Sequence, residues 1–242
     1  MGWRDGKLFR VWAAIYRELW GGLKHRLLPH TENSYAVLLG PGRGVRVWTN
    51  PAHGGTRVLL GHYEPPLMRW LERVVKPGST FYDVGSNDGH IALIAAKLVG
   101  QEGCVYAFEQ DTETRKCLQR NLELNPDLAS RIHVVPYSVG RIHDVGAAKL
   151  SLDGFAAEAT VVRAPDAIKV DVEGAEDDVL VGMRQLLNDR RPALFIECHS
   201  LELHRTVKRF VGDYHRDVGE AVPSLLEVSR QGYNSWVYVF DV

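Results

Sequence analysis

The chain has 242 residues, of which 45% are hydrophobic and 24% are charged, and its formal net charge is −1 at pH 7. This length and composition fit one large α/β domain, or one domain with additions, and they exclude an intrinsically disordered chain. A charge so close to zero creates no overall field that would gather nucleic acid, so no nucleic-acid partner is expected.

The location expected from the sequence is the cytoplasm. No apolar run approaches the ~18 residues that a membrane span requires. The basic N-terminus lacks the apolar core of a signal peptide. The three cysteines, Cys104, Cys117 and Cys198, are far apart and lack CxxC spacing. This pattern is typical of free thiols in a reducing compartment.

Residues 4–28 predict an amphipathic helix. Apolar side chains recur there at steps of three and four, and most of its charged side chains are Lys or Arg. Such a helix can lie on anionic lipid or bind an acidic partner, so peripheral membrane contact is one interpretation. A helix packed on its own domain is the favoured interpretation. A Gly- and Pro-rich stretch with a short strand at 45–48 follows, so residues 1–60 are expected to form a helical and β appendage.

From residue 61 onward the pattern is that of an α/β domain. A helix begins at the two prolines of "HYEPPL". Strands are then predicted at 80–84, 105–109, 132–135, 167–172, 193–198 and 236–240, and helices at 89–98, 113–124, 176–187, 201–210 and 223–230. Strands that alternate with helices imply right-handed βαβ units. Residues 61–242 should therefore form a doubly wound, mostly parallel Rossmann-like sheet covered on both faces.

The loop "GSNDG" after the first of these strands is the first functional signal. Gly85 and Gly89 bracket it, at the edge of the sheet where such folds bind ligands. It lacks the central glycine of the GxGxxG dinucleotide motif, and Asp83 and Asp88 would repel a diphosphate, which disfavours NAD. Glu109 ends the second strand, about where a nucleoside site places a carboxylate against ribose hydroxyls. S-adenosylmethionine, a nucleoside with a cationic group and no phosphate, fits this pattern.

Several motifs, in order, resemble the FkbM family of S-adenosylmethionine-dependent methyltransferases. They are "YEPPL", "FYDVGSNDGHIALIAA", "VYAFEQD", "LSLDGF", "IKVDVEGAEDDVLVG" and "PALFIECH", and they cover about residues 61–200. The resemblance implies a methyltransferase fold with S-adenosylmethionine as cofactor. The residues that it places around the cofactor are Glu64, Asp83, Gly85, Ser86, Asn87, Gly89, Glu109, Gln110 and Ser138. The chain after Phe240 leaves little room for a separate seventh strand.

The resemblance also implies which part of the cofactor each of these residues would contact. The glycine loop would surround its methionine part, and Glu109 would bind the ribose. Gln110 and Ser138 would lie near the adenine. Tyr63 and Glu64 correspond to an element just before the domain and close to the cofactor, although an acid there also suits the first turn of a helix.

The predicted catalytic residues follow two later strands and are Asp171, Glu173, Glu197 and His199. Methyl transfer needs an aligned acceptor, and a hydroxyl acceptor must also lose its proton. Glu197 and His199 are two apart in a strand and can point together, so His199 is preferred as the base. Asp171, Glu197 and His199 could instead hold a hard cation such as Mg²⁺. Asp171 and Glu173 could also simply cap the next helix.

The function expected is O-methylation of a hydroxyl on a small molecule or a sugar, and the basic N-terminal helix would suit a lipid-linked acceptor. One alternative is a methyltransferase that acts on nitrogen or on a macromolecule. Another is a non-catalytic, nucleoside-binding scaffold, which the acid and base residues at the strand ends argue against. An NAD-dependent oxidoreductase is opposed by the missing GxGxxG motif.

Overall fold

The structure is a computed structural model that describes residues 28–53, 55–158, 162–214, 218–221 and 235–239. The amphipathic helix predicted over 4–28 lies, apart from its last residue, outside this range. The helix predicted over 223–230 lies outside it as well. The described residues comprise the domain and the segment that begins at residue 28.

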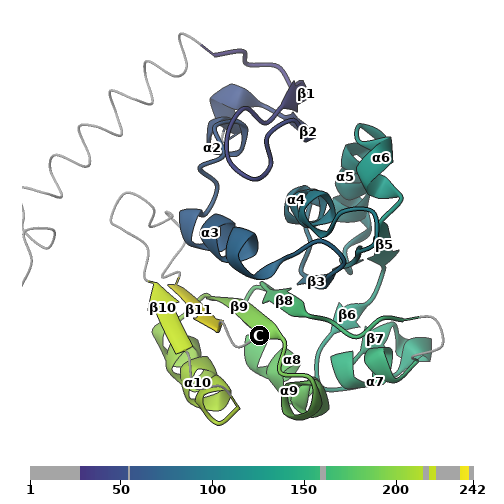
Figure 1. Cartoon of the computed structure of the whole chain (residues 1–242), viewed down its shortest axis with the longest axis vertical. Helices are drawn as coiled ribbons and strands as arrows, with labels where there is room; N and C mark the ends of the chain where they lie inside the picture. The colour runs from purple at the N-terminus through teal and green to yellow at the C-terminus, as the bar shows by residue number, and fades with distance from the viewer. Residues whose placement is uncertain (1–27, 54, 159–161, 215–217, 222–234, 240–242) are drawn as a thin grey trace, which may run out of the picture.

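A seven-stranded sheet forms the centre of the molecule (Figure 1). Its strands are, in chain order, β3 (Thr80–Val84), β4 (Cys104–Phe108), β5 (Ile132–Val135), β8 (Ala167–Val170), β9 (Ala193–Cys198), β10 (Val218–Ala221) and β11 (Ser235–Val239). The spatial order is β10–β11–β9–β8–β3–β4–β5. Neighbours from β9 to β5 run parallel, whereas β11 and β10 add antiparallel at one edge. The predicted doubly wound, mostly parallel sheet is confirmed.

The sheet contains a seventh strand that was not predicted, and it does not lie after Phe240. The additional strand, β10, precedes β11 in the chain and pairs with it, with Val218 opposite Val239. It is a short edge strand whose described side chains are partly or fully exposed. The sequence "VGEA" therefore carries no apolar alternation, which is the signal by which strands are predicted.

Helices cover both faces of the sheet (Figure 1). One face carries α3 (Pro65–Val74), α4 (His90–Val99), α5 (Thr112–Glu123) and α6 (Pro126–Ala129). The other face carries α7 (Leu152–Ala157), α8 (Glu176–Val181), α9 (Arg184–Asp189) and α10 (Leu201–Gly212). Adjacent residues of β3 point to opposite faces, so Phe81 packs with Trp70 in one apolar core and Tyr82 packs with Phe155 in the other.

The single helix predicted over 176–187 is in fact the two helices α8 and α9. The chain turns at Gly182, where an added Cβ atom would collide with the carbonyl oxygen of Gly140. The glycine thus lets a neighbouring loop approach closely. The Asp153 carboxylate then accepts hydrogen bonds from two backbone N–H groups of α9 at 3.0 and 2.9 Å. An uninterrupted apolar pattern hides a break of this kind, because both helices bury the same face.

An N-terminal hairpin packs on the face that carries α4 and α5. It consists of β1 (Asn33–Ala36) and β2 (Arg46–Thr49), followed by η2 (Pro51–His53) and α2 (Gly55–Leu59). Its valines, Val37, Val45 and Val47, belong to the same apolar core as Trp70. Only β2 was predicted from the sequence. A second small pair, β6 (Ser138–Val139) and β7 (Lys149–Leu150), flanks η3 (Val145–Ala147) on the other side of the sheet.

Two side-chain amides fasten this hairpin to the domain. Asn121 Oδ1 accepts a hydrogen bond from the Trp48 N–H group at 2.7 Å, and Asn125 Oδ1 accepts one from the Arg46 N–H group at 2.9 Å. The Nδ2 group of Asn125 also donates to the Arg46 carbonyl oxygen at 2.7 Å. Asn121 Nδ2 donates instead to the carbonyl oxygen of Asp88 at 2.9 Å, so this side chain joins β2 to the glycine loop.

Among the described residues, no helix is both long and apolar enough to cross a membrane. The three cysteines are free thiols, as predicted: Cys104 and Cys198 are buried in β4 and β9, and Cys117 is exposed on α5.

Candidate functional site

The glycine loop, Gly85–Gly89, lies at the carboxyl end of β3, between β4 and β8. Gly85, Asn87 and Gly89 all have left-handed backbone, with φ of 74°, 49° and 79°. At Gly85 an added Cβ atom would overlap the backbone carbonyl oxygen of Asp171. The loop can lie this close to the end of β8 only because the residue is glycine.

Glu109, the residue after β4, binds the same loop. Its Oε2 accepts a hydrogen bond from the Asn87 N–H group at 3.0 Å, and its Oε1 accepts one from the Asp111 N–H group at 2.9 Å. A carboxylate offers about four acceptor positions, so positions remain for a ligand. These two contacts hold the carboxylate in place at the mouth of a cavity.

This cavity, of about 270 Å³, opens between the ends of β3, β4 and β8. The predicted cofactor residues that line it are Gly85, Asn87, Glu109, Gln110 and Ser138. A smaller adjoining cavity of about 110 Å³ is lined by Glu64 and Ser86, together with Tyr63 and Lys169. The remaining two predicted residues support the loop, because Asp83 is buried in β3 and Gly89 is the N-cap of α4.

Lys169, in β8, is a site residue that the sequence analysis missed. Its ammonium group donates to the Gly85 carbonyl oxygen at 2.7 Å. It also lies 3.4 Å from Asp83 Oδ1 and 3.4 Å from Asp171 Oδ2. Burial opposes the charge, but the surrounding carboxylates raise the pKa of Lys169 overall, so it stays protonated. The available signal was a lysine inside the apolar run "AIKV".

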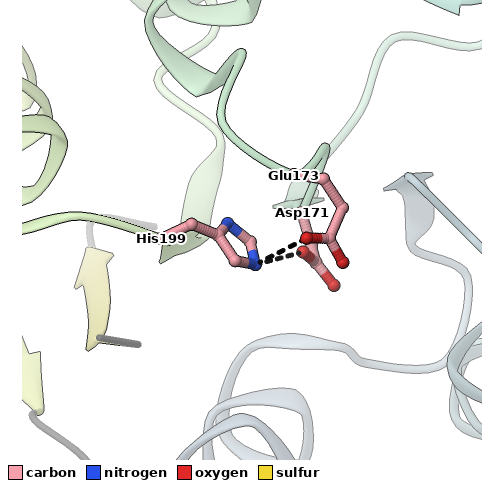
Figure 2. A group of neighbouring side chains, drawn as sticks. All are labelled: Asp171, Glu173 and His199. Atoms are coloured by element: carbon pink, nitrogen blue, oxygen red, sulfur yellow. Dashed lines mark ion pairs between the residues drawn. The ribbon is translucent and has the colours of Figure 1, made fainter. Parts of the chain in front are cut away.

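The structure brings the predicted catalytic residues together. Figure 2 shows Asp171 and Glu173 pointing from beyond the end of β8 toward the ring of His199, which follows β9. His199 Nε2 lies 3.5 Å from Asp171 Oδ1, 3.5 Å from Glu173 Oε2 and 4.0 Å from Glu197 Oε1. We call Asp171, Glu173 and His199 the acid–histidine cluster.

The backbone turns sharply at this cluster. Glu173 is a non-glycine residue with φ of 56°, and Gly174 has φ of 105°. β8 ends at Val170, two residues before the predicted end of the strand at 172. The turn aims the Glu173 side chain back toward His199. Left-handed non-glycine residues are enriched at functional sites, where surrounding contacts hold them.

Glu176, the first residue of α8, orients the histidine and was also missed. It is fully buried, and its Oε1 lies 3.1 Å from His199 Nδ1 and accepts a hydrogen bond from the Gly174 N–H group at 3.1 Å. The Glu176 hydrogen bond raises the pKa of His199 to about 9, with further contributions from Asp171 and Glu173. At neutral pH, with no ligand bound, the His199 side chain is therefore protonated. It must lose that proton before it can act as a base.

A third cavity, of about 370 Å³, borders the cluster on the side of His199. Its lining is mostly polar and consists of Gly174, Asp177, His199, Ser200, Glu202, Leu203 and Thr206. The 270 Å³ cavity borders the cluster on the other side, through Asp171 and Glu173. The acid–histidine cluster thus separates two spaces that could each hold a molecule.

Comparison with known families decides what kind of domain this is. Residues 83–233 match the family described as the Methyltransferase FkbM domain. The chain belongs to this family. The matched range contains all the predicted catalytic residues, and every predicted cofactor residue except Glu64.

Curated relatives of this FkbM domain match a shorter part of it. The ribosomal protein L11 methyltransferase of Desulfitobacterium hafniense is 34% identical over 106 residues, 44% of this chain and 32% of the relative. The protein of the same name from Levilactobacillus brevis is 35% identical over 98 residues, 40% of this chain and 27% of the relative. The chain thus spans about a third or less of the length of these relatives.

Solved structures share the fold. The FkbM methyltransferase from Methylobacillus flagellatus KT aligns with a TM-score of 0.53 at 20% identity, over 66% of this chain and 43% of the other. The precorrin-6y C5,15-methyltransferase from Geobacter metallireducens GS-15 aligns with a TM-score of 0.51 at 14% identity, over 72% of this chain and 86% of the other. The Rossmann-like methyltransferase fold expected from the sequence is thereby confirmed.

Proposed function

We propose that this FkbM domain is an S-adenosylmethionine-dependent methyltransferase that acts on a hydroxyl oxygen of a small molecule or a sugar. One observation carries the proposal. The glycine loop and Glu109 line a cavity that is also lined by Asp171 and Glu173 of the acid–histidine cluster. A nucleoside subsite beside a cluster of ionisable groups suits group transfer between two bound molecules, which depends on their alignment. The expected cytoplasmic location is part of the same proposal.

The residues present fit the cofactor. Gly85 and Asn87 of the glycine loop line the cavity, and Glu109 beside them keeps acceptor positions for ribose hydroxyls. Gln110 and Ser138, at the far side of the cavity, would contact the adenine. Burial raises the pKa of Glu64 to about 7, so at slightly alkaline pH this carboxylate adds negative charge near Asp171, which favours a cationic ligand. S-adenosylmethionine, when bound, supplies an activated methyl group.

The acceptor would occupy the 370 Å³ cavity. Asp177, Ser200, Glu202 and Thr206 give it several hydrogen-bonding groups, which suit an acceptor with several hydroxyls. Glu197, or His199 once it has lost its own proton, would then take the hydroxyl proton. Burial raises the pKa of Glu197 to about 8, close to the range in which general bases work well. A lipid-linked sugar is the acceptor that the basic residues of segment 4–28 would favour, through contact with a membrane surface.

A second candidate is methyl transfer to nitrogen or to a macromolecule, here a protein. The relatives named as ribosomal protein L11 methyltransferases favour it, since they are 34% and 35% identical to parts of this chain. Both candidates use the same cofactor. Transfer of labelled methyl groups from S-adenosylmethionine to saccharides, compared with transfer to protein extracts, separates them.

The cofactor assignment is tested by calorimetric titration of the protein with S-adenosylhomocysteine and, separately, with NAD. We expect the thioether to bind and NAD not to bind. Glu109→Gln should weaken binding about 10- to 100-fold, because it removes charge-assisted hydrogen bonds to the ribose. The matched control is Glu113→Gln, which changes an exposed acid that pairs only with Lys116 in the described structure and should leave affinity unchanged. Binding of NAD, or equal affinity in Glu109→Gln, would refute the assignment.

A further inference from the structure

We infer that Asp171, Glu173 and His199 form a binding site for one divalent transition-metal ion of the Mn²⁺ class. The ion would lie between the 270 Å³ and 370 Å³ cavities, next to the acceptor. Its role in catalysis rests on the proposed function, whereas the site itself rests on the geometry of the cluster. The sequence suggested Mg²⁺ with Glu197 as a ligand; the structure places Glu173 nearer to His199 Nε2 than Glu197.

The distances within the cluster match shared coordination rather than hydrogen bonding. The ligand atoms of its three residues all lie within 4.8 Å of one another. His199 Nε2 is 3.5 Å from each carboxylate, which is too long for a good hydrogen bond. Metal–ligand bonds of about 2.1 Å place neighbouring ligands about 3.0 to 3.4 Å apart at octahedral to tetrahedral angles. The three atoms could therefore contact one ion after small movements.

Glu176 provides the outer contact that a metal-binding histidine usually has. Its buried Oε1 lies 3.1 Å from Nδ1 of His199. A proton held on Nδ1 by this carboxylate leaves the lone pair of Nε2 available for a metal ion held between His199, Asp171 and Glu173. Carboxylates in this position orient the ring and make it a stronger ligand.

A buried oxygen within the cluster lacks a hydrogen-bond partner. Asp171 Oδ1, the atom nearest His199 Nε2, is inaccessible to solvent and accepts no hydrogen bond in the described structure. Its other oxygen is neutralised by Lys169. A buried carboxylate oxygen without a donor is unfavourable unless a cation neutralises it. Glu173, by contrast, is an exposed side chain that the left-handed turn directs toward the same point.

The ligand types select among divalent ions. Mg²⁺ binds almost only oxygen and keeps several waters, whereas imidazole suits the transition metals. Two carboxylates and one imidazole therefore favour Mn²⁺ or a neighbouring transition ion over Mg²⁺. A bound ion of this kind would lower the pKa of an acceptor hydroxyl. In the metal-loaded protein His199 would be a ligand rather than the base.

The test is titration of the full chain with Mn²⁺, with free Mn²⁺ followed by electron paramagnetic resonance. We expect saturable binding of one ion per chain and weaker competition by Mg²⁺ than by Zn²⁺ or Co²⁺. Glu173→Gln should weaken Mn²⁺ binding at least about tenfold, and Glu176→Gln about 10- to 100-fold through the loosened histidine. Glu202→Gln is the matched control, because it removes an acid beside the cluster that is not among its ligands, and it should leave Mn²⁺ affinity unchanged.

S-adenosylhomocysteine binding by each variant is measured in parallel, so that a folding defect is not read as a lost metal ligand. Absence of saturable Mn²⁺ binding by a wild-type protein that binds S-adenosylhomocysteine would overturn the metal site and leave the proposed function standing. Equal Mn²⁺ affinity in Glu173→Gln would also overturn it. If Mn²⁺ binding depends on Glu173 but the protein does not bind S-adenosylhomocysteine, the metal site would be supported and the proposed function refuted.

Discussion

Lys169 joins three parts of the site with one side chain. It binds the carbonyl oxygen of the glycine loop at Gly85, and its charge lies between Asp83 in β3 and Asp171 beyond β8. A buried ion pair of this kind adds little net stability, but removal of one partner leaves uncompensated charge in the interior. The residue therefore ties the shape of the loop to the charge state of two carboxylates.

Replacement of this lysine should be strongly destabilising. We expect Lys169→Met to lower the free energy of unfolding by about 3–5 kcal/mol, because Asp83 and Asp171 lose their cation. Lys116→Met, at an exposed lysine paired with Glu113, should cost less than about 1 kcal/mol. Urea unfolding measures both. Adding Asp83→Asn to Lys169→Met should recover part of the lost stability. An equal loss of unfolding free energy in Lys169→Met and Lys116→Met would contradict the structural role given to Lys169.

The residues of the candidate site differ in whether their roles could be predicted from the sequence. Gly85, Glu109 and His199 follow strands, so the periodicity of the chain alone places them at the ligand-binding edge of the sheet. The roles of Lys169 and Glu176 depend on groups that are distant in the chain. Nothing in the sequence near Glu176 indicates that His199 lies beside it, because an acid in the first turn of a helix is already explained by the helix dipole.

At the scale of elements, the turn from β3 to α4 depends on its first glycine. Gly85→Ala should destabilise the protein and weaken binding of S-adenosylhomocysteine, because an added Cβ atom would overlap the Asp171 carbonyl oxygen and push the loop away from β8. Gly78→Ala is the matched control: its φ of 88° is also left-handed, but nothing lies within 4 Å of the added atom.

The two glycine variants separate backbone strain from steric overlap. Gly78→Ala should cost only the left-handed strain of about 1–2 kcal/mol. Gly85→Ala should cost at least about 2 kcal/mol more, since overpacking adds to the strain. Thermal and urea unfolding provide the comparison. An equal loss of unfolding free energy in Gly78→Ala and Gly85→Ala would show that the loop does not depend on its close approach to β8.

Elements were predictable where one face is buried in a regular pattern. The parallel strands β3, β4, β8 and β9 have apolar runs, and their prediction was correct to within two residues at each end. The edge strand β10 and the break between α8 and α9 were not predictable in this way. The first has no apolar pattern, and the second depends on Gly182 meeting Gly140 across the fold.

At the scale of the whole molecule, the N-terminal hairpin is connected to the candidate site. Asn121 accepts a hydrogen bond from β2 and donates one to Asp88 in the glycine loop. Asn121→Ala should therefore lower the free energy of unfolding by about 1–3 kcal/mol and also weaken S-adenosylhomocysteine binding, because buried backbone groups on both sides lose their partner.

Asn125→Ala is the control for this connection. It removes the side-chain hydrogen bonds with Arg46 of the same hairpin and with the Asn121 carbonyl oxygen, none of which is made with the glycine loop. It should reduce stability by a similar amount, as measured by urea unfolding, and leave ligand affinity unchanged in calorimetry. Equal losses of affinity in the two variants would mean that the hairpin supports the site only through general stability.

The order of strands also governs when the chain can fold. β3 pairs with β4, which follows it closely in the sequence, and with β8, which is much further along the chain. Just before β8, the Asp166 carboxylate accepts a hydrogen bond from the N–H group of Thr80, 86 residues earlier. Pairing at such separation is slow, because a long loop must close before any contact is gained. During synthesis, the face of β3 that carries Tyr82 stays exposed until β8 and the helices around it have left the ribosome. While the 86 residues from Thr80 to Asp166 are being made, the nascent chain therefore presents a strand with one unpaired edge and an uncovered apolar face, which is the kind of state that chaperones protect from aggregation.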